Sequence, residues 1–265
     1  MLADWLQGPY LYRLYEEYGF LHEQIAALYM VGYGTAMIAG PLMGGLADRH
    51  GRKKMSMLFC GIYAASCLCK LSPSFLFLVL GRFFSGISTA LLTSTFESWM
   101  LAEHDRMGFP SDWLPRIFGL ATFGNGVVAV LAGVLAHVAA DCCGHAPSRP
   151  FLLAVVVLAI TAATINNTWD ENRPPEEELL VAGPAMADRL GSALRPILRT
   201  RKIWLLGTVQ ALFEGAVYTF VFLWTPSIDA AEQRAHELDH PPLGIVFGSF
   251  MYGAPTPTPL PSLPP

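Results

Sequence analysis

The sequence predicts an all-α integral membrane protein, a bundle of helices that cross the bilayer several times. Hydrophobic residues make up 53% of the chain and charged residues only 14%, whereas soluble domains carry roughly 25% charged residues. The mean hydropathy is +0.41, and the charges gather in loops between long apolar runs. Several of these runs approach or exceed the length of about 20 apolar residues with which a helix crosses the hydrocarbon core.

The elements follow from the apolar runs in order. Residues 1–15 predict an amphipathic half-helix, too short to cross a bilayer alone. Residues 24–46 carry no charge and predict the first complete span, and residues 55–71 predict its antiparallel neighbour. A short Ser-Pro-Ser turn follows. Further spans are predicted at residues 75–100, 117–140, 151–165 and 203–224. A polar loop is predicted at 226–242, and the start of another helix at 243–252.

The predicted spans fall into two groups. Residues 1–167 form an N-terminal transmembrane bundle with an incomplete first helix, and residues 168–202 form a cytoplasmic linker. Residues 203–252 start a second bundle with one full and one partial span. Residues 253–265 are proline-rich and predict polyproline II or disorder. Within the linker, residues 190–198 predict either a helix on the inner leaflet or a solvated segment.

The most specific motif is a polar hairpin at residues 44–54, which reads G-G-L-A-D-R-H-G-R-K-K. Its four cations predict a cytoplasmic loop, because positive residues stay on that side of the membrane. Asp48 ends the preceding helix, where nearby cations compensate its unfavourable interaction with the helix dipole. The residues expected to carry this motif are Gly44, Asp48, Arg49, Gly51, Arg52 and Lys53.

The distribution of basic residues supports this orientation. The predicted topology places twelve of the 17 Lys and Arg residues inside, half of them in the long linker, four outside, and Arg82 within a span. The four outer residues are Arg13, Lys70, Arg149 and Arg234.

Ionisable residues inside predicted spans are candidates for a substrate or ion path, because a charge near the bilayer centre is costly. Arg82 lies about two turns into its helix from the outer side. Ser85, Ser88 and Thr89 follow it and offer hydroxyl donors. This cluster is the best candidate for anion binding or coupling, and the alternative is that Arg82 only pairs with a neighbouring helix.

Three carboxylates are further candidates for substrate binding or coupling. Glu97 lies near the inner end of the helix that carries Arg82, where a simple membrane-edge position is the alternative. Glu214 interrupts an uncharged span with Gln210 one turn earlier on the same face, so it is expected to be protonated or paired; a structural hydrogen bond is the alternative. Asp4 is a candidate for lining a central cavity.

The sequence shows no nucleophile paired with a base and no nucleotide-binding loop, so we predict neither an enzyme nor a cofactor. Cys142, Cys143 and His145 lack the spacing of a closed tetrahedral metal site, so no metal is predicted. The net charge of −4 and the absence of a basic cluster with aromatic residues give no reason to expect a nucleic-acid partner.

The hairpin, as G-x-L-A-D-R-x-G-R-K, resembles the signature loop between the second and third helices of the major facilitator superfamily. The R-x-x-x-G pattern from Arg82 to Gly86 resembles the fourth-helix motif of the same superfamily. More of the chain looks like the molybdate-anion transporter family. The stretches that carry this likeness are Asp4-Trp5-Leu6-Gln7, Pro9-Tyr10-Leu11-Tyr12, Ser88-Thr89-Ala90-Leu91-Leu92, Phe96-Glu97-Ser98-Trp99, Gln210-Ala211-Leu212-Phe213-Glu214 and Phe222-Leu223-Trp224-Thr225-Pro226.

This resemblance implies a major facilitator-type helical bundle, mostly the N-terminal six-helix half plus the start of the second half. It implies uptake of molybdate, a tetrahedral divalent oxyanion, by a multi-pass protein that we expect in the plasma membrane. Family members bind substrate between two six-helix bundles that rock against each other. Molybdate and the lipid bilayer are therefore the expected partners.

The likeness covers the first bundle and only part of the second, so we expect a truncated member that does not transport when expressed alone. Self-association or pairing with a full-length transporter is a further expectation. The alternatives are a non-transporting fragment or isoform, or a major facilitator carrier for another small solute.

Overall fold

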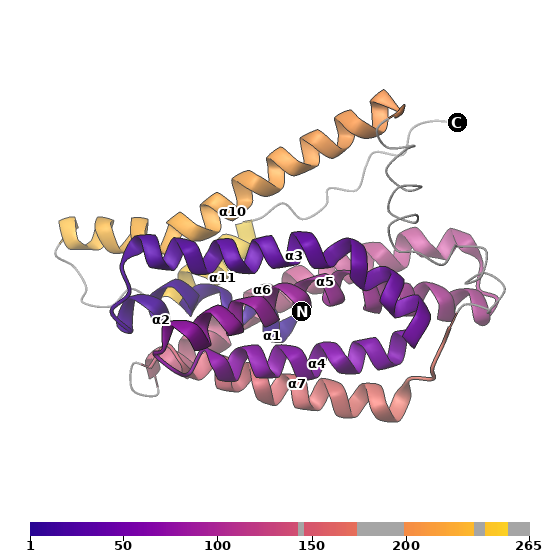
Figure 1. Ribbon diagram of the computed structural model, residues 1–265, viewed down its shortest axis with the longest axis horizontal. Helices are drawn as coiled ribbons and strands as arrows, with labels where there is room; N and C mark the ends of the chain where they lie inside the picture. The colour runs from indigo at the N-terminus through magenta and orange to yellow at the C-terminus, as the bar shows by residue number, and fades with distance from the viewer. Residues whose placement is uncertain (143–145, 174–198, 236–241, 254–265) are drawn as a thin grey trace.

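The computed structural model describes residues 1–142, 146–173, 199–235 and 242–253. Every regular element in these residues is helical (Figure 1). The predicted interfacial helix at 190–198 and the proline-rich tail from residue 254 lie outside the described residues.

The prediction of an all-α membrane bundle is confirmed. Five described helices are long and apolar enough to cross a membrane. They are His22–His50, Phe75–Arg106, Ser111–Ala140, Arg149–Thr168 and Arg201–Glu232.

The chain begins with three short helices instead of the single half-helix that the sequence predicts. They are α1 (Leu2–Trp5), η1 (Gly8–Tyr10) and α2 (Leu11–Glu17). Pro9 lies in the first turn of η1, where a residue without a backbone N–H donor can start a helix but cannot continue one. The segment is therefore divided into short helices.

The polar hairpin is not a loop, which corrects the prediction for residues 44–54. Helix α3 (His22–His50) and helix α4 (Arg52–Cys69) both run into it, and Gly51 alone separates them. Gly51 has a φ of +100°, a backbone conformation that residues with a Cβ rarely adopt. Asp48 does lie in the last turn of α3, as the sequence predicts.

Two later helices are longer than predicted. Helix α5 (Phe75–Arg106) continues beyond residue 100. Helix α10 (Arg201–Ala235) passes through Pro226 into the segment 226–242, where the sequence predicts a polar loop. Arg13 of α2 forms an ion pair of 3.4 Å with Asp229 in this extension, so a tertiary contact holds it against the first helices.

The remaining elements complete the bundle. They are a 3₁₀ turn η2 (Ser111–Trp113), α6 (Leu114–His137), a π-helical turn η3 (Val138–Cys142), α7 (Arg149–Thr168) and α11 (Leu243–Gly253). Helix α5 packs against α3 and α4, α4 packs against α7, and α6 packs against α11. Helix α10 lies beside α3 where Tyr218 and Phe222 contact Tyr33 and Tyr29, and its other end diverges from the bundle (Figure 1).

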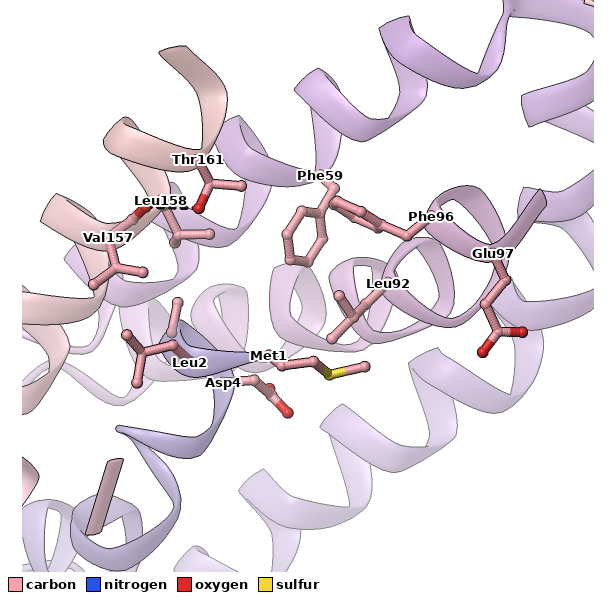
Figure 2. Close-up of a pocket in the computed structure, with 11 residues that line it drawn as sticks. Met1, Leu2, Asp4, Phe59, Leu92, Phe96, Glu97, Val157, Leu158 and Thr161 are labelled. Atoms are coloured by element: carbon pink, nitrogen blue, oxygen red, sulfur yellow. Dashed lines mark hydrogen bonds between the residues drawn. The ribbon is translucent and has the colours of Figure 1, made fainter. Parts of the chain in front are cut away.

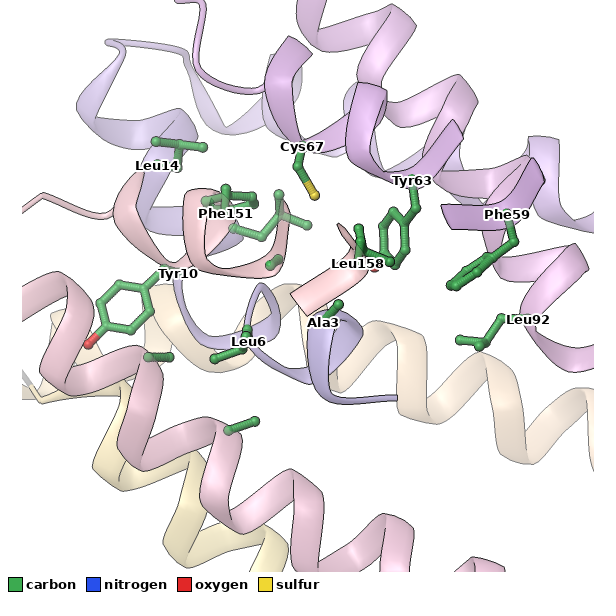
Figure 3. Close-up of a cluster of buried hydrophobic side chains, with 14 of the residues drawn as sticks. Ala3, Leu6, Tyr10, Leu14, Phe59, Tyr63, Cys67, Leu92, Phe151 and Leu158 are labelled. Carbon is green, nitrogen blue, oxygen red and sulfur yellow. The ribbon is translucent and has the colours of Figure 1, made fainter. Parts of the chain in front are cut away.

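The short N-terminal helices fill the centre of the bundle. Helix α1 contacts α6 and α7, and Leu6, Leu14 and Tyr15 are completely buried. Figure 3 shows the side chains of Leu6 and Leu14 together with Phe59 of α4 and Phe151 of α7 in one apolar cluster. The hydrophobic core is therefore organised around the first residues of the chain.

Helices α3 and α5 approach each other most closely at Gly86. A Cβ atom added there would lie 2.5 Å from the carbonyl oxygen of Gly32 and 2.6 Å from Cβ of Thr35. Small residues at such positions let the backbones of membrane helices come together. No side chain fits at position 86 without separating the two helices.

We expect Gly86→Ala to lower the stability of the bundle, since overpacking of a tight contact typically costs about 1–3 kcal/mol. Gly34→Ala is the matched control, because a Cβ at Gly34 of the same pair of helices would meet no atom within 4 Å. The apparent melting temperature in detergent, followed by size-exclusion chromatography after heating, measures the difference. Equal melting temperatures for the two variants would contradict the close contact.

Candidate anion-binding site

A large cavity lies between the N-terminal helices, α3, α5, α10 and α11, and has a volume of about 960 Å³. Most of its wall is aromatic or aliphatic. The charged groups that line it are Asp4, Lys70 and Arg82. Ligand sites are commonly apolar cavities of this size with a few converging polar groups.

Arg82 is the central cation of this cavity, with only 5% of its surface exposed. Its Nε atom donates to the carbonyl oxygen of Leu28 at 3.1 Å. Its guanidinium lies 4.8 Å from the ring centre of Tyr29 and 5.7 Å from that of Tyr33, distances at which a cation is attracted to an aromatic face. Carbonyl and rings fix the guanidinium without neutralising its charge.

Gly32 makes room for this arrangement. A Cβ atom at position 32 would lie 2.6 Å from Nη2 of Arg82. No ion pair among the described residues includes Arg82. A buried cation without a carboxylate partner is a costly arrangement, and it is the arrangement that an anion would complete.

Two of the three predicted hydroxyl residues line the same cavity as Arg82. Ser85 and Thr89 do so, and the Thr89 hydroxyl donates to the carbonyl oxygen of Ser85 at 3.0 Å. Ser88 does not line the cavity; it is fully buried, and its Oγ atom has no hydrogen-bond partner. The structure therefore brings together Arg82, Ser85 and Thr89, and places Ser88 on another side of α5.

The three candidate carboxylates lie in different places. Asp4 lines the larger cavity and accepts a short hydrogen bond from the hydroxyl of Tyr63. Asp4 and Glu97 both line a second, smaller cavity of about 200 Å³, shown in Figure 2. Glu214 lines neither cavity, and its Oε1 atom accepts from Nε2 of Gln210 at 2.9 Å.

Lys70 is a site residue that the sequence indicates only as one of the four cations on the outer side of the membrane. Its surface is only 1% exposed, and the hydroxyl of Tyr18 donates to its carbonyl oxygen at 3.0 Å. Its Nζ atom donates to Oε1 of Gln7 at 2.7 Å. The sequence signal is a lone cation at the end of an apolar run.

The hairpin residues belong to a second polar cluster, at the predicted cytoplasmic ends of α4, α5 and α7. Nη2 of Arg52 pairs with Oδ1 of Asp48 at 3.1 Å. Lys53 donates its Nζ to the carbonyl oxygens of Asn166 and Trp169 at 3.0 and 2.6 Å, which satisfies orphan acceptors at the end of α7. Gly44 and Arg49 lie in the last turns of α3.

Glu171, which lies in the predicted cytoplasmic linker, caps the start of α4. Its carboxylate oxygens accept from the backbone N–H groups of Lys53 and Lys54 at 3.0 and 3.2 Å. A carboxylate is favourable there, because the first N–H groups of a helix lack partners and carry its positive dipole end. A Cβ at Gly51 would lie 2.5 Å from the carboxyl carbon of Glu171, so this cap also requires glycine.

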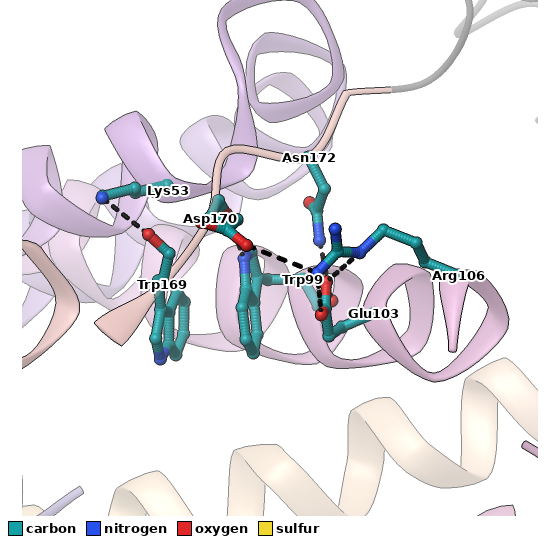
Figure 4. Close-up of polar contacts among 7 residues, drawn as sticks. All are labelled: Lys53, Trp99, Glu103, Arg106, Trp169, Asp170 and Asn172. Atoms are coloured by element: carbon teal, nitrogen blue, oxygen red, sulfur yellow. Dashed lines mark hydrogen bonds and ion pairs between the residues drawn. The ribbon is translucent and has the colours of Figure 1, made fainter. Parts of the chain in front are cut away.

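Neighbouring residues extend the cluster to α5. The rings of Trp99 and Trp169 stack at 3.8 Å, and Nε1 of Trp99 donates to the carbonyl oxygen of Asp170 at 3.0 Å. Asn172 donates to the carbonyl oxygen of Trp99 at 3.2 Å. Figure 4 shows how the segment after α7 joins α4 and α5 through these contacts.

We expect Glu171→Ala to destabilise the protein, since the loss of a helix-capping side chain costs about 0.5–2 kcal/mol. Asp105→Ala removes an exposed carboxylate from the end of α5 and serves as the control. Thermal unfolding in detergent should show a lower midpoint for the first variant only. A midpoint unchanged by Glu171→Ala would contradict the capping role.

Comparison with known proteins agrees with the motifs. The MFS_5 family, described as "Sugar transporters, 12 TM", matches residues 1–256. The molybdate-anion transporter of Xenopus tropicalis is 44% identical over 254 residues, which cover 95% of this chain and 52% of that protein. The molybdate-anion transporter of Danio rerio is 41% identical over 267 residues, which cover 94% of this chain and 54% of that protein.

A more distant relative is the uncharacterized MFS-type transporter YvkA of Bacillus subtilis, 27% identical over 202 residues, which cover 74% of this chain and 42% of that protein. The chain spans about half the length of the curated molybdate-anion transporters that it matches. The predicted resemblance to major facilitator transporters, and within them to molybdate-anion transporters, is confirmed. The chain is a multi-pass integral membrane protein and belongs to the MFS_5 family of the major facilitator superfamily.

Proposed function

We propose that the chain takes part in the uptake of molybdate, as a carrier and not as an enzyme, in the plasma membrane. The observation that carries this proposal is the buried guanidinium of Arg82, which lines a large cavity without a carboxylate partner. Relatives named molybdate-anion transporters support the choice of anion. Charged donors form the strongest hydrogen bonds to oxyanions, and they do so best in a site shielded from water.

The proposed contacts with the anion use those N–H groups of Arg82 that do not donate to a protein acceptor. Its Nε–H is used by the carbonyl oxygen of Leu28, and a guanidinium carries four further N–H groups on its two Nη atoms. Within the described residues these Nη groups have no acceptor. A planar fork matches two oxygens of a tetrahedral anion, and Ser85 lies one helical turn further along the same cavity wall.

Asp4 is the proposed coupling carboxylate. A divalent anion brings two negative charges into the cavity, and a proton carried by a nearby carboxylate would offset one of them. Asp4 lines the cavity of Arg82, Glu97 lines only the smaller cavity that it shares with Asp4, and Glu214 lines neither. The geometry supports Asp4 over the other two for this role.

We further propose that the chain works together with a second chain, either another copy or a full-length transporter. The favouring observation is helix α10, whose apolar surface is exposed along its membrane-length segment. Glu214 and Gln210 lie in the middle of this surface. Carboxylates in contact with lipid are costly, so a protein partner over this face would stabilise the helix.

The anion site is tested by equilibrium binding of radiolabelled molybdate to the chain in lipid nanodiscs. We expect Arg82→Gln to weaken binding more than tenfold, because each charge-assisted hydrogen bond contributes about 1.5–3 kcal/mol. Arg82→Lys should recover it in part, since an ammonium lacks the planar fork. Arg116→Gln, which removes an exposed cation, is the control. Unchanged affinity in Arg82→Gln would contradict the proposed site.

Transport is tested in cells that lack their own molybdate uptake, with molybdate supplied at limiting concentration and membrane levels of the protein quantified. The chain is expressed alone and together with a full-length molybdate-anion transporter that carries a disabling substitution. We expect accumulation that depends on Arg82 when both chains are present. If molybdate accumulates neither in cells that express the chain alone nor in cells that express both proteins, the proposed role in uptake is contradicted.

A further inference from the structure

We propose that Lys70 is a second anion-binding cation, which acts with Arg82 to make the cavity selective for divalent over monovalent oxyanions. This inference rests on the proposed function of the cavity. Four observations carry it: the burial of Lys70, its incomplete set of partners, the contacts that hold it in place, and the sum of charges around the cavity.

The ammonium group of Lys70 is buried without a counter-ion. Only 1% of the residue is exposed, and no ion pair among the described residues includes it. Burial of an unpaired charge costs several kcal/mol. A negatively charged ligand in the cavity would offset this cost.

The partners of Lys70 are neutral and leave donors unused. Of the three N–H groups on an ammonium, one donates to Oε1 of Gln7 at 2.7 Å. The rings of Phe151 and Tyr63 lie with their centres 5.5 and 5.9 Å from Nζ, which favours a cation without removing its charge. Lys70 lines the same cavity as Arg82, so the remaining donors are available to an anion there.

Several contacts fix Lys70 relative to Arg82. Ser66 of α4 donates its hydroxyl to the carbonyl oxygen of Gly81 at 2.7 Å. A Cβ at Gly81 would lie 3.1 Å from Cβ of Cys69 and 3.5 Å from Cγ of Lys70. The end of α4 is thus pressed against the residue that precedes Arg82 in α5. Lys70 and Arg82 both line the cavity, so a ligand there can meet both cations.

The hydrogen bond to Gln7 also helps to fix the position of the Lys70 ammonium. The Gln7 amide itself donates to the carbonyl oxygen of Ala3 at 3.0 Å, which orients its oxygen toward Nζ of Lys70. The hydroxyl of Tyr18 donates to the backbone carbonyl oxygen of Lys70. Such preorganisation lowers the entropic cost of binding a ligand.

The charge sum explains why one cation is insufficient. With Asp4 ionised, Arg82 and Asp4 alone would leave the lining of the cavity neutral, and Lys70 raises its net charge to +1. With Asp4 protonated, as the coupling role requires, Lys70 raises the net charge from +1 to +2. A net positive cavity attracts anions, and a second cation adds more to the binding of a dianion than to that of a monoanion, because Coulomb energy scales with the product of the charges.

The test compares two tetrahedral oxyanions of similar size in nanodiscs, molybdate with two charges and perrhenate with one. We expect Lys70→Met to weaken molybdate binding about tenfold and perrhenate binding less, so that the ratio of the two affinities falls. Lys70→Arg, which keeps the charge, should preserve the ratio. Lys202→Met removes an exposed cation and should change neither affinity.

The ratio of molybdate affinity to perrhenate affinity distinguishes a binding role of Lys70 from a structural role. Damage to the fold would weaken both anions equally and would not be rescued by Lys70→Arg, and this result would overturn the inference. Molybdate binding that depends on Arg82 but is unchanged in Lys70→Met would overturn the role of Lys70 and leave the proposed function intact. Absence of binding to the unsubstituted chain would overturn both.

Discussion

The contact between α3 and α5 at Gly32 and Gly86 is the constraint on which the cavity depends. Gly32 presents its carbonyl oxygen to α5 where Gly86 has no side chain, and its own missing Cβ is the space that the guanidinium of Arg82 fills. One pair of glycines therefore sets both the separation of two helices and the position of a buried cation. Because Arg82 then stacks on Tyr29 and Tyr33 of α3, the cation in turn helps to hold the helices together.

The hydropathy of the chain predicted the fold class well, because lipid imposes a length and composition on each span that few other structures share. Helix ends were less predictable. The polar residues at 44–54 and 226–242 suggested loops, but α3, α4 and α10 continue into them. Charged residues in the last turns of membrane helices have the same composition as a loop, and only the positive φ of Gly51 distinguishes the actual turn.

The candidate site was predictable where one helix supplies it. Arg82, Ser85 and Thr89 follow the helical repeat and line one cavity, whereas position 88 lies about 240° around the helix from position 82, which explains why Ser88 points elsewhere. Lys70 could not be placed in this way. Gln7 and Tyr18, which form hydrogen bonds with Lys70, are far away in sequence, and no pattern within α4 indicates their presence.

The cap on α4 has an evolutionary consequence. The carboxyl group of Glu171 occupies the volume in which any side chain at position 51 would begin, although the two residues are far apart in sequence. A side chain at position 51 would displace the carboxyl group of Glu171. Glycine is needed at position 51 both for this carboxyl group and for the positive φ, and loss of Glu171 would remove the first of these two requirements. Substitutions at these positions are therefore constrained to occur together, and an alignment of relatives should show them as a covarying pair.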